Sequence, residues 1–416
     1  MADDALAVKL ADRRVPVGGD WLSGAELAEI TPAELIRRAG ALKPLLAAHA
    51  LEAERLRRPV DEVIQALRDS GVFYHFVPKS YGGLEFDIDT FIDVMLPLGE
   101  GCASTAWVTS FCVEHNWMFS QFPKALQDET FGSAFPYVIA PGVTNPPGVA
   151  SPVEGGYRLT GHWKFGTGVM HADWILAAGV VPDEKPPRVL FCALPASEVE
   201  VIDTWRVDGM IGTGSNDIAV RDVFVPAHRT LNMAEMREGR APGSKLHSNP
   251  IYRMPMLPFL ALTAAIPAVG VARSAVSYFR DRMRERVSFG TDLKQAEKPA
   301  AQMRLAHADV LTQTAELMLR AVGRENVEFG RRGEATNVEA RIALRVKVAH
   351  AMRMCREAVG TVCEASGASA HALDNPLQRA QRDVNVMSSH VVYDLDLANE
   401  QHGRAMIGLP PNSPLT

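Results

Sequence analysis

The chain has 416 residues, which predicts two or three packed domains, because single domains commonly contain about 100 to 200 residues. Its composition of 47% hydrophobic and 22% charged residues excludes extensive disorder, and its net charge of -6 argues against a nucleic-acid partner. The five cysteines lack CxxC spacing and residues 1–14 lack an apolar signal region, so we expect reduced thiols and a cytoplasmic location.

The first third of the chain, residues 1–136, predicts a helical domain. Thr31-Pro32-Ala33-Glu34 has the residues of a capping box, with a hydroxyl at the N-cap, proline at the first helical position and a carboxylate at the third. The helix predicted over 59–70 ends before Gly71, which suits a left-handed C-terminal cap. Its apolar stripe consists of Val60, Val63, Ile64 and Leu67, and further helices are expected from about Asp89 and over 103–127.

Residues 137–237 predict a β domain, because short β-branched runs are separated here by Gly and Pro. Their close spacing favours an antiparallel barrel or sandwich, with a tight hairpin turn at Glu154-Gly155-Gly156. The strands are expected over 157–161, 174–181, 189–194 and 218–225.

Two glycine-rich loops of this domain are candidate ligand sites. The loop 209–215 leads into a strand, so it is not a dinucleotide fingerprint, which opens a helix. It is either a bulged turn or a loop whose amides and hydroxyls bind a phosphate or a planar ring. In the loop 161–168, the glycines on both sides of Thr167 allow a ligand to approach closely while the hydroxyl stays available.

Residues 238–416 predict a four-helix bundle, so the expected fold class is α+β and mostly α. The uncharged run 254–272 is long enough to cross a membrane, but three prolines and a glycine interrupt it. We therefore expect a buried core or subunit-interface helix and no membrane partner. The four helices are expected over 257–286, 299–324, 337–366 and 376 to about 403.

The chain contains no HExxH, GxSxG or P-loop pattern and no cluster with metal-ligand spacing. Zinc protease, serine hydrolase and NTPase functions therefore lack support, and we expect no metal. The twelve histidines include His115, His171 and His390, which gain interest only through their neighbours.

The order helices, sheet, helices resembles the acyl-CoA dehydrogenase superfamily over nearly the whole chain, with 56–85 as its helical opening and 284–309 as its bundle signature. Within that superfamily the sequence is most similar to the oxygenase components of two-component flavin monooxygenases, relatives of the 4-hydroxyphenylacetate hydroxylase oxygenase. The three segments that carry this narrower resemblance are 112–129, 161–174 and 376–390.

The resemblance implies a reaction of reduced flavin with O₂ that forms a C4a-hydroperoxide and hydroxylates a small aromatic, most readily phenolic, compound. Reduced FMN is the expected flavin, with reduced FAD as the alternative. Thr167 matches a serine beside flavin N5, His115 matches the histidine that holds or ionises the substrate hydroxyl, and His390 matches the other active-site histidine. Because no dinucleotide fingerprint is present, a separate NAD(P)H-dependent flavin reductase is expected, and the family implies a homotetramer.

Further site residues follow from the resemblance by position. His171 either belongs to the site or packs the end of a strand. The apolar segments 111–122 and 253–259, which include Trp117 and Phe259, are expected to line the substrate pocket, although core packing explains them equally well. The implied flavin contacts are Trp107, Thr167, Gly168, Thr213, Gly214, Ser215 and Arg286, and the implied substrate contacts are His115, His390, Trp117 and Phe259.

The rival functions depend on the missing base. Many acyl-CoA dehydrogenases carry a catalytic Glu at the position matched here by Val391, which cannot abstract a proton. An acyl-CoA dehydrogenase with FAD and a base elsewhere therefore remains an alternative, as do a monooxygenase that oxidises nitrogen or sulfur and a non-enzymatic protein that kept the scaffold.

Overall fold

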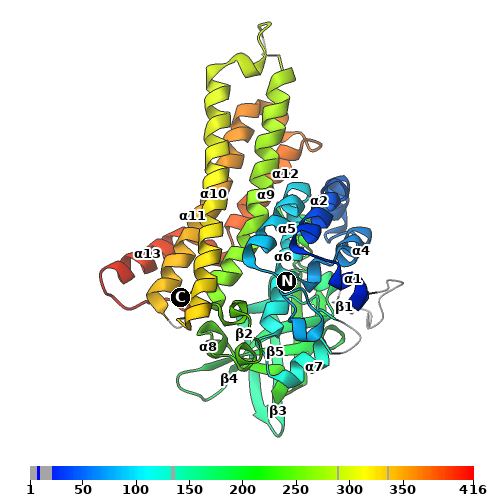
Figure 1. The fold of residues 1–416 in the computed structure, drawn as a ribbon, viewed down its shortest axis with the longest axis vertical. Helices are drawn as coiled ribbons and strands as arrows, with labels where there is room; N and C mark the ends of the chain where they lie inside the picture. Colours follow the sequence, from blue (N-terminus) through cyan, green and yellow to red (C-terminus); the bar gives the residue numbers. More distant parts are fainter. Residues whose placement is uncertain (1–6, 10–20, 133–135, 288–289, 335–336) are drawn as a thin grey trace, which may run out of the picture.

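The computed structural model describes residues 7–9, 21–132, 136–287, 290–334 and 337–416. Most of the segment examined for a secretory signal, and positions 288–289 of the predicted bundle signature, lie outside these ranges. In Figure 1 the long C-terminal helices run vertically, the sheet lies at their lower end, and the N-terminal helices lie beside the bundle. The predicted order of helices, sheet and helices is confirmed.

Local sequence signals position the N-terminal helices. The Thr31 hydroxyl caps α2 by accepting the Glu34 N–H at 3.2 Å, but the Glu34 carboxylate, predicted to complete a capping box, binds Arg37 and Arg38 instead. Gly71 ends α4 with a φ of 87°, as predicted, and the predicted apolar stripe of α4 is buried. The helices are α1 Gly24–Ala28, α2 Pro32–Ala48, α3 Ala50–Leu56, α4 Asp61–Ser70, α5 Ile88–Gly101, α6 Ala103–Phe119 and α7 Lys124–Thr130.

The middle of the chain forms one eight-stranded sheet in the order β1-β6-β7-β3-β2-β4-β5-β8. The predicted hairpin is present, with Val153 opposite Gly156, but the sheet is not wholly antiparallel, because β2 pairs parallel with β4. After β3 the chain is back at the end where β2 began, so β4 runs in the same direction as β2. The strands are β1 Ala7–Lys9, β2 Gly142–Val153, β3 Gly156–Trp163, β4 Trp174–Val181, β5 Arg188–Pro195, β6 Glu200–Ile202, β7 Asp217–Pro226 and β8 Thr230–Asn232.

Trp163 anchors the core of the sheet. Its side chain is fully buried, and its Nε1 donates to the Ala178 carbonyl at 2.8 Å. Gly148 and Gly161 leave room for the indole, since a Cβ at either position would lie 2.5 Å from the ring. Glycine at these positions therefore serves close packing rather than flexibility.

The bundle differs from the prediction at its end. The single helix expected from 376 to about 403 is two helices, separated by the turn Val391–Tyr393, and Asp394 caps the second by accepting the Leu397 N–H at 3.0 Å. The helices are α8 Met233–Arg237, α9 Met256–Glu285, α10 Pro299–Arg332, α11 Val338–Ser366, α12 Pro376–Ser388 and α13 Leu395–Met406.

Helix α9 contains the apolar run that is long enough to cross a membrane. Within the described part of the chain it is the one helix with that length and composition, and 83% of its most apolar window is buried inside the protein. The burial matches the predicted core helix.

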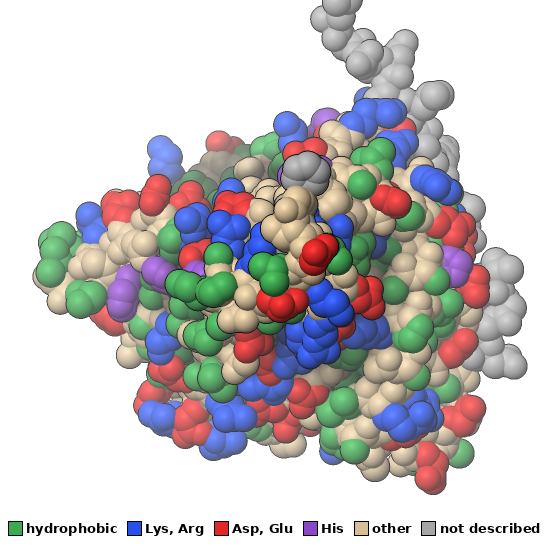
Figure 2. Space-filling model, turned by 90° about the horizontal axis from the view of Figure 1, so that it is seen from above, with side chains coloured by type: hydrophobic (Ala, Val, Ile, Leu, Met, Phe, Trp, Pro, Cys, Tyr) green, Lys and Arg blue, Asp and Glu red, His purple; other side chains and the backbone are tan. Residues whose placement is uncertain are grey.

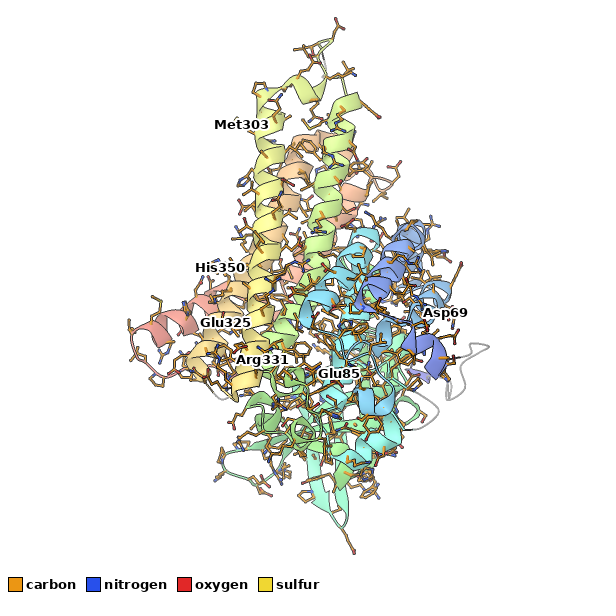
Figure 3. The ribbon with its side chains drawn as sticks, in the orientation of Figure 1. Asp69, Glu85, Met303, Glu325, Arg331 and His350 are labelled. Carbon is orange, nitrogen blue, oxygen red and sulfur yellow. The ribbon has the colours of Figure 1, made fainter. Side chains whose placement is uncertain are left out.

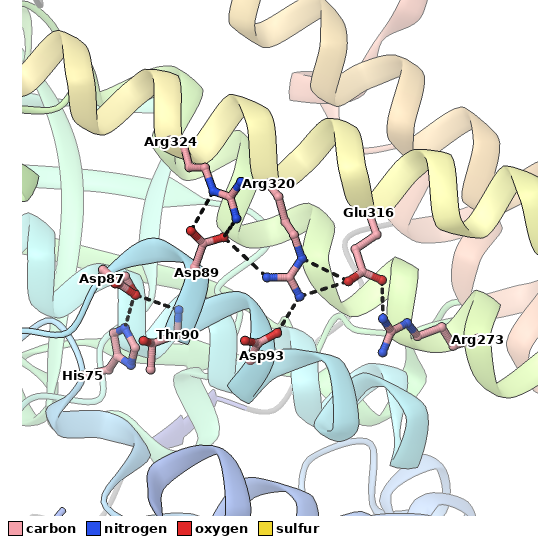
Figure 4. A network of polar contacts seen from close by, with 9 residues as sticks. All are labelled: His75, Asp87, Asp89, Thr90, Asp93, Arg273, Glu316, Arg320 and Arg324. Atoms are coloured by element: carbon pink, nitrogen blue, oxygen red, sulfur yellow. Dashed lines mark hydrogen bonds and ion pairs between the residues drawn. The ribbon is translucent and has the colours of Figure 1, made fainter. Parts of the chain in front are cut away.

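An ion-pair network fixes the N-terminal helices to the bundle (Figure 4). Arg320 of α10 contacts Asp93 at 2.5 Å and Asp89 at 3.4 Å, both on α5, while Glu316 joins Arg320 to Arg273 of α9. Arg320 is mostly buried, so these bonds hold α5 in one register against α10. The network joins the predicted domain 1–136 to the predicted domain 238–416, and the boundaries of these domains remain a prediction.

Candidate functional site

One face of α6 carries an aromatic row. Trp107, Phe111 and His115 follow one another at intervals of four residues, so they lie on the same side of the helix. The Trp107 and Phe111 ring centroids are 4.9 Å apart, and those of Phe111 and His115 are 5.7 Å apart. The spacing was visible in the sequence, where Phe111 was selected only as the start of the apolar segment 111–122.

His390 meets this row from the break between α12 and α13. Its ring centroid lies 6.0 Å from that of Trp107, 6.3 Å from that of Phe111 and 5.9 Å from that of Tyr393. Although the residue as a whole is exposed, burial of its imidazole lowers the pKa of His390 to about 4, so the ring is neutral at pH 7. Both predicted histidines thus pack against Phe111, and the helix break that the sequence analysis missed makes this possible.

The partners of His115 fix its tautomer. Its Nδ1 lies 2.5 Å from the Ala140 carbonyl oxygen, which only accepts, so Nδ1 carries the proton and Nε2 has a lone pair. Burial lowers the pKa of His115 to about 4, so the imidazole is neutral at pH 7. His115 therefore presents an acceptor.

His390 has the opposite polarity. Its Nδ1 accepts the Val392 N–H at 3.3 Å, so in the neutral ring the proton is on Nε2. The aromatic row therefore contains one histidine that accepts, His115, and packs against one that donates, His390. Such a pair can hold a hydroxyl group in a defined orientation, with its proton directed at His115.

A second group of predicted residues forms a chain of hydroxyls. Thr167 Oγ1 lies 3.0 Å from Ser215 Oγ, which lies 2.8 Å from Thr213 Oγ1. All three side chains are buried, so the chain is shielded from bulk water. These residues come from the two glycine-rich loops that the sequence analysis selected as ligand sites.

Both loops lie directly on α6. A Cβ at Gly168 would be 3.1 Å from Cys112 Sγ and 3.3 Å from Val108, and a Cβ at Gly212 would be 3.1 Å from Ser104. The hydroxyl chain is therefore positioned along the same helix that carries the aromatic row. The loop 209–215 is a turn that contains a short 3₁₀ helix, with Gly214 at a φ of 59°, and it joins directly onto β7.

Trp117 and Phe259 lie elsewhere. Their ring centroids are 4.8 Å apart, both side chains are fully buried, and Trp117 Nε1 donates to the Ile251 carbonyl at 2.7 Å. Trp117 comes two residues after His115, which places it about 200° around the helix and on its other side. Both residues thus take the core-packing role that the sequence analysis left open, and we leave them out of the site.

Arg286 is also remote from the hydroxyl chain. It follows α9, whose early residue Thr263 contacts Glu114 of α6, so about 35 Å of helix separates Arg286 from α6. There it lines a hollow of about 360 Å³ together with Lys298 and Arg304, and its guanidinium donates to the Ser366 carbonyl at 2.6 Å. Arg286 therefore lies near the opposite end of α9 from the residue that contacts Glu114.

Two buried polar side chains complete the surroundings. His171 contacts Asp61 of α4 at 3.0 Å and Arg58 at 3.2 Å, so it ties the sheet to the N-terminal helices. Glu114, which the sequence analysis did not select, is 1% exposed and lies 3.5 Å from His115 Nε2. Burial raises the pKa of Glu114 well above its usual value. Its only sequence signal is a single charge in an otherwise uncharged helix.

Known proteins are similar to this chain in sequence and in fold. The family described as acyl-CoA dehydrogenase, C-terminal domain, matches residues 262–395. The pigment production hydroxylase of Rhodococcus sp. (strain ATCC 21145) is 38% identical over 93% of this chain and 100% of its own length. The FADH(2)-dependent resorcinol hydroxylase, oxygenase component, of Rhizobium sp. (strain MTP-10005) is 31% identical over 91% of this chain and 95% of its own length. The solved structure of XiaF from Streptomyces sp. in complex with FADH2 and glycerol has a TM-score of 0.86 and 30% identity, covering 94% of this chain and 98% of that one.

A helical domain, a sheet and a helical bundle in this order define an acyl-CoA dehydrogenase fold, which confirms the predicted fold class. Buried hydroxyls beside an aromatic, two-histidine site suit a flavin enzyme. The chain belongs to the flavin-dependent monooxygenases that form the oxygenase components of two-component hydroxylases. The predicted family and enzyme class are confirmed, and the acyl-CoA dehydrogenase and non-enzymatic alternatives lose their support.

Proposed function

We propose that this monooxygenase uses reduced flavin and O₂ to hydroxylate a small aromatic compound that carries a hydroxyl group. The observation that carries the proposal is the pair of histidines, His115 and His390, which pack against Phe111 with opposite hydrogen-bonding polarity. The printed name of the resorcinol hydroxylase supports a phenolic substrate.

Each residue of the site has a defined task. His115 Nε2 accepts a hydrogen bond from the substrate hydroxyl, which makes the aromatic ring richer in electrons and easier to hydroxylate. His390 Nε2–H donates to the substrate or to its oxygen atom. Trp107, Phe111 and Tyr393 surround the ring and exclude water from it.

The residues present fit a flavin, because the hydroxyl chain ends in an unshared lone pair on Thr167 that can accept from the ring. Thr167, Gly168, Thr213, Gly214 and Ser215 would hold the cofactor, which supplies the electrons that activate O₂ when it is bound. The sequence favoured FMN, whereas the FADH2 in the names of two relatives supports FAD. We include a separate flavin reductase, which the term oxygenase component supports.

The proposal includes assembly into a homotetramer, in which Arg286 reaches the flavin of a neighbouring copy. Support comes from the distance of Arg286 from its own site and from exposed apolar residues at every seventh position of α10: Met303 at 72%, Val310 at 60% and Leu317 at 69% exposure. Met303 lies on the outer side of the bundle (Figure 3). Figure 2 looks onto the bundle end and shows Lys and Arg side chains gathered near its middle.

The location we propose is cytoplasmic, supported by five buried free cysteines.

The test is an oxygenation assay with the purified protein, reduced FAD or FMN, O₂, and resorcinol as substrate. We expect hydroxylated product with the wild type, and a decrease of about 10²- to 10⁴-fold with His115→Gln, while hydrogen peroxide release continues. The control His171→Gln, which alters a structural histidine, should retain product formation. Equal product from the wild type and His115→Gln would refute the role of His115, and product from an amine or a sulfide but not from resorcinol would favour the remaining alternative, oxygenation of nitrogen or sulfur.

A further inference from the structure

We propose that Ser215 and Thr213 set the redox preference of the flavin site, because they hold the Thr167 hydroxyl in the orientation of a hydrogen-bond acceptor. The inference rests on the proposed function, in which Thr167 lies against the flavin. Ser215 and Thr213 then make the site prefer reduced flavin over oxidised flavin, in addition to contacting the cofactor.

The hydroxyl chain has a fixed direction. At its inner end the Met210 carbonyl accepts from Thr213 Oγ1 at 2.9 Å and from Trp205 Nε1 at 3.1 Å, and a carbonyl has no proton to give. Because the single Thr213 proton is used there, Ser215 must donate to Thr213, and Thr167 must donate to Ser215. Thr167 therefore offers lone pairs, and no proton, at the outer end.

The inner end is held from the bundle. Met210 has a φ of 55°, and its N–H donates to Asp383 Oδ1 of α12 at 2.6 Å. Asp383 is 3% exposed, and a Cβ at Gly209 would lie 2.3 Å from the Arg382 carbonyl oxygen, so this loop is pressed against α12. The Met210 carbonyl thus cannot easily turn away, which preserves the direction of the chain.

The direction has a chemical consequence. A reduced flavin carries an N–H at ring position N5, whereas the oxidised ring has a lone pair there. An acceptor at Thr167 therefore satisfies the reduced ring, whereas the oxidised ring requires Thr167 to turn its proton toward N5 and to give up its bond to Ser215. One hydrogen bond of this kind changes an equilibrium by about two- to twelvefold.

The test is an anaerobic equilibrium dialysis of the full-length protein with oxidised FAD and with chemically reduced FAD, repeated with FMN. The readout is the ratio of the two dissociation constants, which needs no turnover. The wild type should bind the reduced form more tightly. Thr213→Val and Ser215→Ala each free the Thr167 proton, so each should lower the ratio by about two- to twelvefold, mainly through tighter binding of the oxidised form.

Matched variants separate this role from packing. Thr213→Ser keeps the hydroxyl and should keep the ratio, as should Thr109→Val, which removes a buried hydroxyl that donates to Thr105 on α6. If Thr213→Val does not fold, Ser215→Ala decides alone. An unchanged ratio, or an equal loss of affinity for both redox states, would overturn the inference while leaving the proposed function intact. A wild type that binds neither form would refute the proposed function as well.

Discussion

The buried carboxyl of Asp383 allows a quantitative test of the structure. Asp383 is 3% exposed, it accepts the Met210 N–H, and burial raises its pKa from 3.8 to about 6. The charged groups around it are Glu54, Arg379 and Arg382, and Arg382 is itself paired with Glu54 at 2.8 Å. The folded protein therefore holds a proton on Asp383 in a pH range in which the unfolded chain has already released it.

The sign and size of the effect follow from this difference. Because the folded state binds more protons, the free energy of unfolding falls as the pH rises from about 4 to about 6. A pKa rise of about two units corresponds to about 3 kcal/mol of lost stability over that range. Asp383→Asn keeps the acceptor oxygen but cannot ionise, so it should be nearly neutral at pH 4 and stabilising by about 3 kcal/mol at pH 7.

The assay is urea unfolding followed by tryptophan fluorescence, performed between pH 4 and pH 7.5 on the wild type and on Asp383→Asn. Only the difference between the two proteins matters, since other carboxylates titrate in both. Asp61→Asn serves as the control, because His171 and Arg58 lower the pKa of Asp61 and its stabilising effect is lost as the pH falls. A difference between the wild type and Asp383→Asn that stays constant with pH would refute the reasoning.

Three further predictions concern packing and assembly. Gly161→Ala places a methyl 2.5 Å from the Trp163 ring and should lower the free energy of unfolding by about 1 to 3 kcal/mol. In the control Gly40→Ala, the new methyl on α2 meets nothing within 4 Å, so the free energy of unfolding should rise by about 0.5 to 1 kcal/mol. Arg320→Met leaves Asp89 and Asp93 without their shared partner and should destabilise the protein by about 1 to 3 kcal/mol, measured by thermal unfolding; an unchanged Tm would show that the network does not hold α5. Val310→Glu should shift the protein to a smaller species in size-exclusion chromatography, and an unchanged elution volume would argue against α10 as a subunit interface.

Local sequence signals predicted much of the fold. The cap at Thr31, the left-handed Gly71 and the hairpin at Gly155-Gly156 all occur where expected, because each depends on a few neighbouring residues. The parallel β2–β4 pair was missed, since strand direction depends on where the chain lies after β3. The break before α13 was also missed, because Val391–Tyr393 has no proline or glycine to mark it.

Motifs and the family resemblance selected most residues of the candidate site, among them His115, Thr167 and His390. They did not distinguish residues that share a helix but face different sides, such as Trp117. They also did not reveal Glu114, whose importance comes from its burial beside His115. Sequence spacing reports which residues lie near one another along an element, and the packing of separate elements decides which of them meet.

The sequence by itself determined the order of the three domains, the turns and caps, and the residue types available for flavin and substrate, because these depend on composition and local conformation. The tertiary structure alone decided the proton direction of the Thr167–Ser215–Thr213 chain and the opposite polarity of His115 and His390. Both depend on carbonyl and amide groups, at Met210, Ala140 and Val392, that every sequence contains and that only the folded chain aims at a particular side chain.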